Sequence, residues 1–170
     1  AGLEITIQGP ELLFTEESVI VITGADLSPT RNGLVVPMWT VIAMPAGSRL
    51  QFGMRRQGTR AYITVAGGID GPLMLGSRST HVRSGLGGLA GRALKKWDQL
   101  NVGPARAAAK YHVGRTLPES NRPRYQRAAA MRVVPGPQVD RFTDDALERL
   151  TRMPYRLSNE SDRMGYRLQG

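Results

Sequence analysis

The feature that most constrains the fold is a succession of short apolar runs through the first hundred residues, each ended by glycine or proline. Residues 3–8 alternate apolar and polar side chains, the period of a half-buried strand. Residues 18–23 form a continuous β-branched run, which predicts a strand covered on both faces. Asn32-Gly33 predicts a hairpin, because both residues tolerate positive φ. Strands at intervals of about 8–12 residues predict a barrel or a sandwich, and the lack of long intervening helices excludes a parallel α/β sheet.

The character of the chain changes after residue 103. Residues 104–127 hold three prolines and six bases against one acid, a composition that predicts a basic linker or mobile loop. Thr143 predicts the N-cap of one short helix over residues 144–152, since the acids come first and the arginines last. Further short strands are expected at 99–102 and 131–134. The predicted organisation is a β domain over 1–103, a basic linker or mobile loop over 104–127, and the start of a second β domain over 128–170.

Composition excludes several classes of protein. The chain has no cysteine, which excludes disulfide scaffolds, zinc ribbons and thiol nucleophiles. No apolar run approaches the ~18 residues of a membrane span, so we expect no membrane contact. The net charge of +9 is uneven, with −4 over residues 1–48, +12 over 49–127 and +1 over 128–170. A basic segment attracts acidic partners, but no nucleic-acid motif accompanies it, and nucleic acid is not an expected partner.

Common catalytic motifs are also absent from the sequence. Residues 85–90 match a dinucleotide fingerprint, yet the run before them is polar and no suitable acid follows. There is no phosphate-binding loop of the G-x-x-x-x-G-K-[ST] type and no nucleophile elbow. His81 and His112 lack the short spacing of common metal pairs, and we predict no metal site.

Two polar clusters remain as candidate sites. The first lies in the glycine-rich residues 66–80, where Asp70 and Arg78 accompany several hydroxyls. Such a loop can bring backbone N–H groups and an arginine fork to a carboxylate or other anion. The second lies in residues 158–168 and repeats the serine, aspartate, arginine and glycine composition. A purely structural role, in which aspartate pairs with arginine and hydroxyls cap turns, stays open for both clusters.

The same residues carry a family resemblance. Five ordered motifs resemble the biotin-dependent carboxyltransferase-like family, whose members include the C-type subunit of 5-oxoprolinase, the second subunit of allophanate hydrolase and antagonists of a sporulation-kinase inhibitor. These motifs are residues 24–39 (G-A-D-L-S-P-T, N-G and P-M-W), 65–70 (V-A-G-G-I-D), 75–80 (L-G-S-R-S-T), 132–138 (R-V-V-P-G-P-Q) and 161–165 (S-D-R-M-G). Family members are about twice this length, so we expect an internal fragment that is inactive alone. Trp97 stands where the family pattern has glycine, and Gly71 where it has an apolar residue.

The resemblance implies a mainly β fold, with a cyclophilin-like β-barrel, one short helix and part of a second, similar domain. It implies a cytoplasmic subunit that works with the two other 5-oxoprolinase subunits, of A and B type, on a small amide or lactam. That complex uses ATP to open 5-oxoproline to glutamate, and carboxyltransferase relatives use biotin to carboxylate urea. The alternative functions are a regulatory module that antagonises a partner kinase-inhibitor subunit, and carboxyl transfer from carboxybiotin to a urea-like substrate.

The matching motif positions supply the candidate site residues. On the resemblance, Arg78 and Arg163 bind anionic substrate or partner groups, while Asp70 and Asp162 orient them. Asp70, Arg78 and Arg163 are the catalytic candidates. The substrate-binding candidates are Ser77, Ser79, Ser161 and Asp162.

Overall fold

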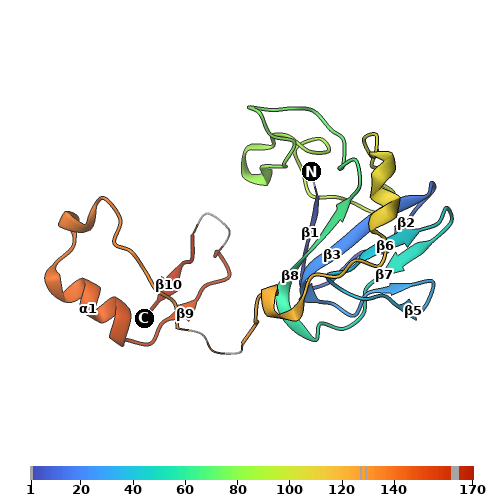
Figure 1. Cartoon of the computed structure of the whole chain (residues 1–170). Coiled ribbons are helices and arrows are strands. Elements are labelled where there is room, and N and C mark those ends of the chain that lie inside the picture. Colours follow the sequence, from blue (N-terminus) through green and yellow to red (C-terminus); the bar gives the residue numbers. More distant parts are fainter. Residues whose placement is uncertain (1, 127, 129, 162–164) are drawn as a thin grey trace. The chain divides into compact units, whose positions relative to one another are not determined.

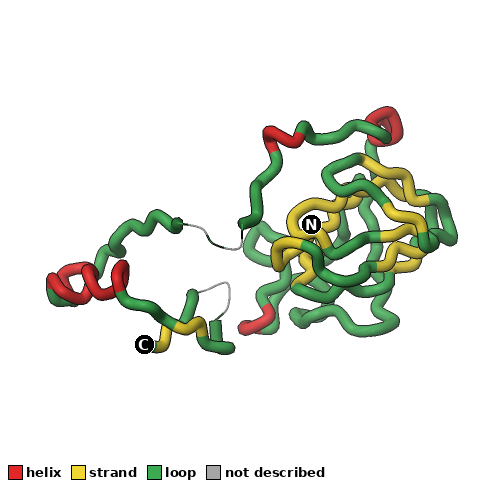
Figure 2. Tube along the Cα trace, turned by 90° about the horizontal axis from the view of Figure 1, so that it is seen from below, coloured by secondary structure: helices red, strands yellow, loops and turns green. Residues whose placement is uncertain are grey.

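The structure, a computed structural model, describes residues 2–126, 128, 130–161 and 165–170. Contacts divide the chain into two compact units, Ala1–Arg127 and Ala128–Gly170. Figure 2 shows most of the strands in the first unit, whereas the described part of the second unit is mainly loop with a helix and two short strands.

The described part of the first unit holds eight strands (Figure 1). They are β1 (Leu3–Thr6), β2 (Leu12–Leu13), β3 (Ser18–Asp26), β4 (Thr30–Arg31), β5 (Leu34–Val35), β6 (Val41–Met44), β7 (Arg49–Gln51) and β8 (Gln57–Val65).

These strands form two four-stranded sheets, both antiparallel. One has the order β1-β8-β3-β6 and the other β2-β7-β4-β5. Strand β3 is central, and every one of its residues is buried or half-buried, as its β-branched sequence predicts. The hairpin predicted at Asn32-Gly33 is confirmed: it joins β4 to β5, with φ of 50° and 82° at its two central residues. Both values lie in the left-handed region that two-residue hairpin turns require.

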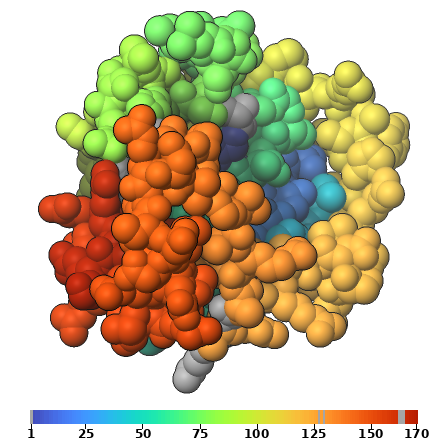
Figure 3. Space-filling model, turned by 90° about the vertical axis from the view of Figure 1, so that its left-hand side faces the viewer, coloured from blue at the N-terminus to red at the C-terminus, as the bar shows by residue number. Residues whose placement is uncertain are grey.

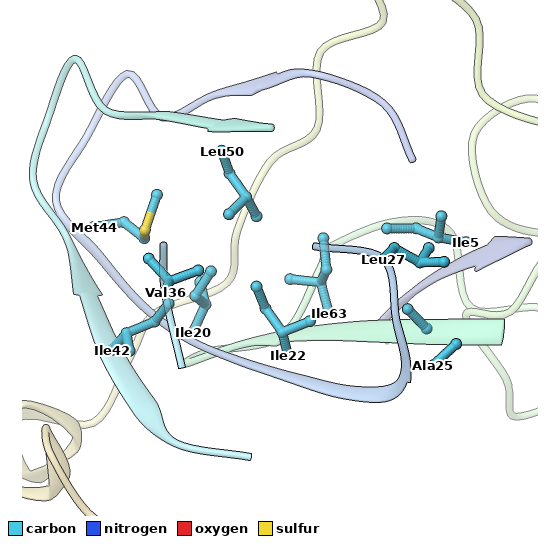
Figure 4. Close-up of a cluster of buried hydrophobic side chains, with 11 residues drawn as sticks. Ile5, Ile20, Ile22, Ala25, Leu27, Val36, Ile42, Met44, Leu50 and Ile63 are labelled. Carbon is cyan, nitrogen blue, oxygen red and sulfur yellow. The ribbon is translucent and has the colours of Figure 1, made fainter. Parts of the chain in front are cut away.

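The hydrophobic core lies between the two sheets. Alternate residues of β3, Ile20 and Ile22, point toward Ile63 of β8 and Met44 of β6, and Leu50 of β7 closes the core from the second sheet (Figure 4). Leu50 is fully enclosed, so the second sheet is anchored by a single deep side chain. Two sheets facing one apolar layer are the arrangement that short alternating strands favour.

The segment predicted as a basic linker or mobile loop, residues 104–127, belongs to the first unit. Its middle runs beside the start of β6: Val41 N donates to Arg115 O at 2.9 Å, and Gly114 N donates to Val41 O at 2.8 Å. Leu117 N also donates to Trp39 O at 2.9 Å. The segment therefore covers part of an edge that β6 would otherwise expose.

The described part of the second unit contains helix α1 (Asp144–Arg152) and a two-stranded sheet of β9 (Arg156–Leu157) and β10 (Leu168–Gln169). The predicted helix is confirmed, with Thr143 at its N-cap. The Thr143 hydroxyl donates to the Asp145 carboxylate at 2.6 Å rather than capping a backbone N–H. The described residues also form short 3₁₀ helices at Val82–Ser84, Ala107–His112, Glu119–Asn121 and Val139–Arg141.

The mainly β fold with one short α-helix is confirmed, while two predicted strands are wrong. Residues 99–102 form only an isolated bridge between Val102 and Ile69, and residues 131–134 are irregular. Neither run has a neighbouring strand to pair with along its length, and alternation alone does not make a strand.

Candidate functional site

The first candidate cluster lies on a long glycine-rich loop that leaves the end of β8 (Figure 1). Its two ends meet backbone to backbone: Gly103 N donates to Gly68 O at 2.9 Å, and Asp70 N donates to Asn101 O at 2.8 Å. A Cβ on Gly67 would lie 2.0 Å from the Gly103 carbonyl oxygen. Only glycine permits this approach, which fixes the base of the loop beside the sheet.

The loop brings Asp70 and Arg78 together. Arg78 Nε lies 3.4 Å from Asp70 Oδ1, and the same oxygen accepts a hydrogen bond from Gly71 N at 2.9 Å. Both side chains are about half exposed, at 56% for Asp70 and 45% for Arg78. An exposed pair of this kind contributes little to stability. The ion pair instead limits the directions in which the Arg78 guanidinium can point.

Ser77 and Ser79 flank Arg78 on a tight turn. Met74 and Ser77 exchange backbone hydrogen bonds at 2.8 and 2.9 Å, and Leu75 and Gly76 between them have φ of 49° and 77°. The Ser77 hydroxyl accepts a bond from Ser79 N at 3.1 Å. These residues are exposed, and in Figure 3 the loop, in green, lies at the molecular surface. The arrangement presents one guanidinium and two hydroxyls to a ligand arriving from solvent.

The second candidate cluster lies in the second unit. Ser161 Oγ accepts a hydrogen bond from Arg167 N at 2.8 Å, and Ser161 N donates to Ser158 O at 3.1 Å. The hydroxyl of Ser161 thus connects the two arms that carry β9 and β10. Asp162 and Arg163 lie outside the described residues, so their predicted roles stay predictions.

Sequence analysis missed a tighter charge pair near the end of the glycine-rich loop. Arg92 donates two hydrogen bonds to Asp98, at 2.7 and 2.9 Å, and Lys95 N adds a third at 2.7 Å. The hydrogen bonds from Arg92, and to a smaller extent the one from Lys95 N, hold the pKa of Asp98 well below its usual range. The same contact raises the pKa of Arg92. The spacing of six residues is not a motif, and only the turn between them creates the pair.

The described residues offer neither a metal cluster nor a membrane-spanning helix. Within the described ranges, no three His, Asp or Glu side chains gather closely enough to hold a metal ion. In the same part of the chain, no helix has the length and apolar character needed to cross a membrane.

The fold and the loop define a class: a mainly β module, built of antiparallel sheets, that presents a polar glycine-rich loop at a strand end. The whole chain, residues 1–170, matches the family described as carboxyltransferase domain, subdomain A and B. The chain therefore belongs to this family.

Individual relatives agree with the family assignment. The chain is 36% identical over 170 residues to the C-type subunit of 5-oxoprolinase from Escherichia coli, covering 99% of this chain and 52% of that protein. It is 33% identical over 175 residues to a urea amidolyase of Saccharomyces cerevisiae, covering 99% of this chain and 10% of that protein. The crystal structure of the Kluyveromyces lactis urea amidolyase superimposes with a TM-score of 0.83 at 32% identity, over 99% of this chain and 11% of that one. The chain thus spans about half the length of the 5-oxoprolinase protein and about a tenth of the amidolyases.

Proposed function

We propose that this chain is part of a cytoplasmic subunit that acts with two partner subunits, of A and B type, to open 5-oxoproline to glutamate at the expense of ATP. The observation that carries the proposal is the 36% identity to the C-type subunit of 5-oxoprolinase, which extends over 99% of the chain. A second protein of that name, from Haemophilus influenzae, is 29% identical over the same share of the chain.

In this proposal the glycine-rich loop of the first unit binds substrate. Opening a lactam places negative charge on the carbonyl oxygen, and guanidinium and backbone N–H donors aimed at that oxygen lower the barrier. Arg78 supplies the guanidinium, and Asp70, 3.4 Å from its Nε, orients it. Ser77 and Ser79 offer hydroxyls beside it. For the second cluster, the family motif alone supports Ser161 and Asp162 as substrate-binding residues and Arg163 as a catalytic residue.

Neither implied cofactor is assigned to this loop. The sequence of this chain holds no phosphate-binding loop of the G-x-x-x-x-G-K-[ST] type. In the proposal ATP is required by the assembled complex, and no residue of the loop is assigned to it. Biotin belongs to the alternative, carboxyl transfer to a urea-like substrate, which the similarity to the urea amidolyases favours. The Arg78 guanidinium suits a carboxyl group brought by that carrier.

The test is reconstitution of the full-length protein with its two partner subunits, followed by ATP-dependent glutamate formation from 5-oxoproline. Arg78→Ala and Arg163→Ala should each lower turnover by about a hundredfold, the typical effect of removing one donor to a developing oxyanion. The complex should still assemble on a sizing column. Arg106→Ala removes an exposed base of the same unit outside both clusters, and it should leave turnover unchanged.

Failure to form glutamate would distinguish between the alternative functions. An assembled complex that makes no glutamate would overturn the proposal. Biotin-dependent carboxylation of urea would then identify a carboxyltransferase. Partner binding without any turnover would identify the regulatory module that antagonises a kinase-inhibitor protein.

A further inference from the structure

A hollow of the first unit lies at the end of the β1-β8-β3-β6 sheet that is opposite to the glycine-rich loop. Its volume is about 500 Å³, and its walls include Asp26 at the end of β3 and Arg56 immediately before β8. The loop follows the other end of β8. Since β8 has nine residues, each rising ~3.3 Å, the two places are about 30 Å apart along the strand. The hollow is therefore distinct from the proposed substrate loop.

Two arginines without an acidic partner among the described residues line this hollow. Arg56 and Arg122 both line it, and within the described residues neither has a carboxylate oxygen within ion-pairing distance. Arg122 donates from Nε to Leu117 O at 2.9 Å, which fixes the guanidinium and leaves its two terminal nitrogens for a ligand. A planar fork held in this way is preorganised for a carboxylate.

The third charged group of the hollow, the Asp26 carboxylate, is negative. Asp26 Oδ1 accepts a hydrogen bond from Ser28 N at 2.8 Å, which holds the carboxylate in place. Its second oxygen is then available to accept an N–H bond from a ligand. With two guanidinium groups and one carboxylate, the hollow carries a net charge of +1, which a ligand of charge −1 would balance.

The remaining wall is firm and partly apolar. Val36 is buried at 7% exposure, and Pro37 and Met38 continue the same wall. Thr40 is also 7% exposed, and its hydroxyl shares a 2.9 Å hydrogen bond with the Thr116 hydroxyl. This bond ties the segment that carries Arg122 to the start of β6. Arg56 N donates to the backbone oxygen of Asp26 at 2.8 Å, so the backbone near each arginine is held by a hydrogen bond.

We propose that this hollow binds a small carboxylate that also carries an N–H donor. The ligand's carboxylate would lie between Arg56 and Arg122, its N–H would donate to Asp26, and its carbon atoms would pack on Val36 and Met38. An N-acylated amino acid has this chemistry, and so does an acidic amino acid with its ammonium group. The proposal does not depend on the activity proposed for the glycine-rich loop.

The test is calorimetric titration of the 170-residue chain, without ATP or partners. N-acetyl-L-alanine and L-aspartate each carry a charge of −1 and an N–H donor, and isobutyrate keeps a carboxylate but lacks the donor. We expect saturable binding of at least one of the first two, and at least tenfold weaker binding of isobutyrate, the value of one charge-assisted hydrogen bond. Tighter binding of N-acetyl-L-alanine would indicate an N-acylated amino acid, and tighter binding of L-aspartate would indicate an amino acid with a free ammonium group.

Variants of the residues that line the hollow test whether the ligand binds there. Arg56→Gln and Arg122→Gln should each weaken binding about tenfold or more. Asp26→Asn keeps an oxygen for Ser28 N but should abolish the preference over isobutyrate. Arg55→Gln is the matched control, because Arg55 donates to Gly58 O and does not line the hollow. Thermal unfolding of each variant checks that it remains folded. Absence of saturable binding by the wild-type chain, or equal weakening by Arg55→Gln, would overturn the proposal.

Discussion

At the scale of single residues, Trp97, where the family resemblance predicts glycine, has a backbone conformation typical of glycine. Trp97 has a φ of 75° and is 84% exposed, in a turn closed by a bond from Asp98 N to Lys95 O at 3.2 Å. Glycine is the usual residue where a turn requires positive φ. Tryptophan therefore takes a glycine-type conformation here, and the turn is retained.

We expect Trp97→Gly to raise the free energy of unfolding by about 0.5 kcal/mol. Relief of the backbone conformation is worth about 1 kcal/mol. Loss of the cation–π contact with Lys96, 4.9 Å from the ring centre, costs about 0.5 kcal/mol at an exposed site. Urea unfolding measures the difference. Trp97→Ala is the control, since it loses the contact but keeps the strain. An alanine variant as stable as the glycine variant would contradict the argument.

The neighbouring Asp98 makes stability depend on pH. Because Arg92 and Lys95 N hold its pKa well below the ordinary 3.8, the folded state is favoured wherever the carboxyl is ionised. That contribution is fully present above the unfolded pKa of about 4 and is lost as pH falls toward the folded value. Asp98→Asn should therefore be less stable than wild type at pH 7, and the gap should narrow in acid. Urea unfolding at pH 7 and at about pH 2.5 tests this, and a gap that widened in acid would refute it.

At the scale of elements, the sequence predicts best where local chemistry decides the outcome. The β-branched residues 18–23 become part of the central strand β3, Asn32-Gly33 forms a hairpin, and the predicted helix forms over residues 144–152. A local sequence pattern does not specify which distant residues a strand pairs with. The two-residue strand β2 forms only because β7 lies beside it, and residues 99–102 lack such a neighbour.

The candidate sites also differ in how far the sequence alone predicts them. Asp70 and Arg78 are eight positions apart, and the turn between Met74 and Ser77 brings them together, so the sequence could place them in one cluster. The hollow beside Asp26 takes Arg56 and Arg122 from distant segments. Its composition follows from the register of β3 and β8 and from the path of residues 104–127, which no local pattern specifies.

The close approach of Gly67 to Gly103 at the base of the glycine-rich loop can be tested by substitution. Gly67→Ala should lower the free energy of unfolding by more than about 2 kcal/mol, since a left-handed alanine alone costs about 1–2 kcal/mol and the Cβ also meets the Gly103 oxygen. Gly76→Ala is the matched control: its φ of 77° is similar to the 89° of Gly67, but no atom lies within 4 Å of the added Cβ. Thermal unfolding compares the two. Equal losses would show that the close approach contributes nothing.

At the scale of the whole molecule, the uneven charge is partly balanced inside the first unit. Three glutamates of the acidic residues 1–48 pair with bases of the basic residues 49–127: Glu4 with Arg60, Glu11 with Arg49 and Glu17 with Lys110. Arg49, followed by Gln51, lowers the pKa of Glu11. Opposite charges that lie far apart in the sequence thus meet across the folded unit. The Glu11–Arg49 and Glu17–Lys110 pairs are exposed and add little stability, whereas the Glu4–Arg60 pair is half-buried.

Stability, by contrast, is concentrated in one unit. Every residue of the hydrophobic core lies between Ile5 and Ile63, and no described residue of Ala128–Gly170 is buried. Large side chains there are open to solvent, with Val134 90% and Phe142 63% exposed. A piece of about 40 residues without an enclosed core is too small to stabilise itself.

The chain shortened to residues 1–127 should therefore unfold cooperatively, with a midpoint within about 5 °C of the 170-residue chain, because about 1 kcal/mol moves the midpoint by only a few degrees. Residues 128–170 alone should give no cooperative transition. Calorimetry of both pieces and limited proteolysis of the intact chain measure this, with early cleavage expected after Arg132 to Arg156 and late cleavage in β3 and β8. A fall of more than about 10 °C in the shortened chain would mean that the second unit adds to the core, since only burial on that scale moves the midpoint so far.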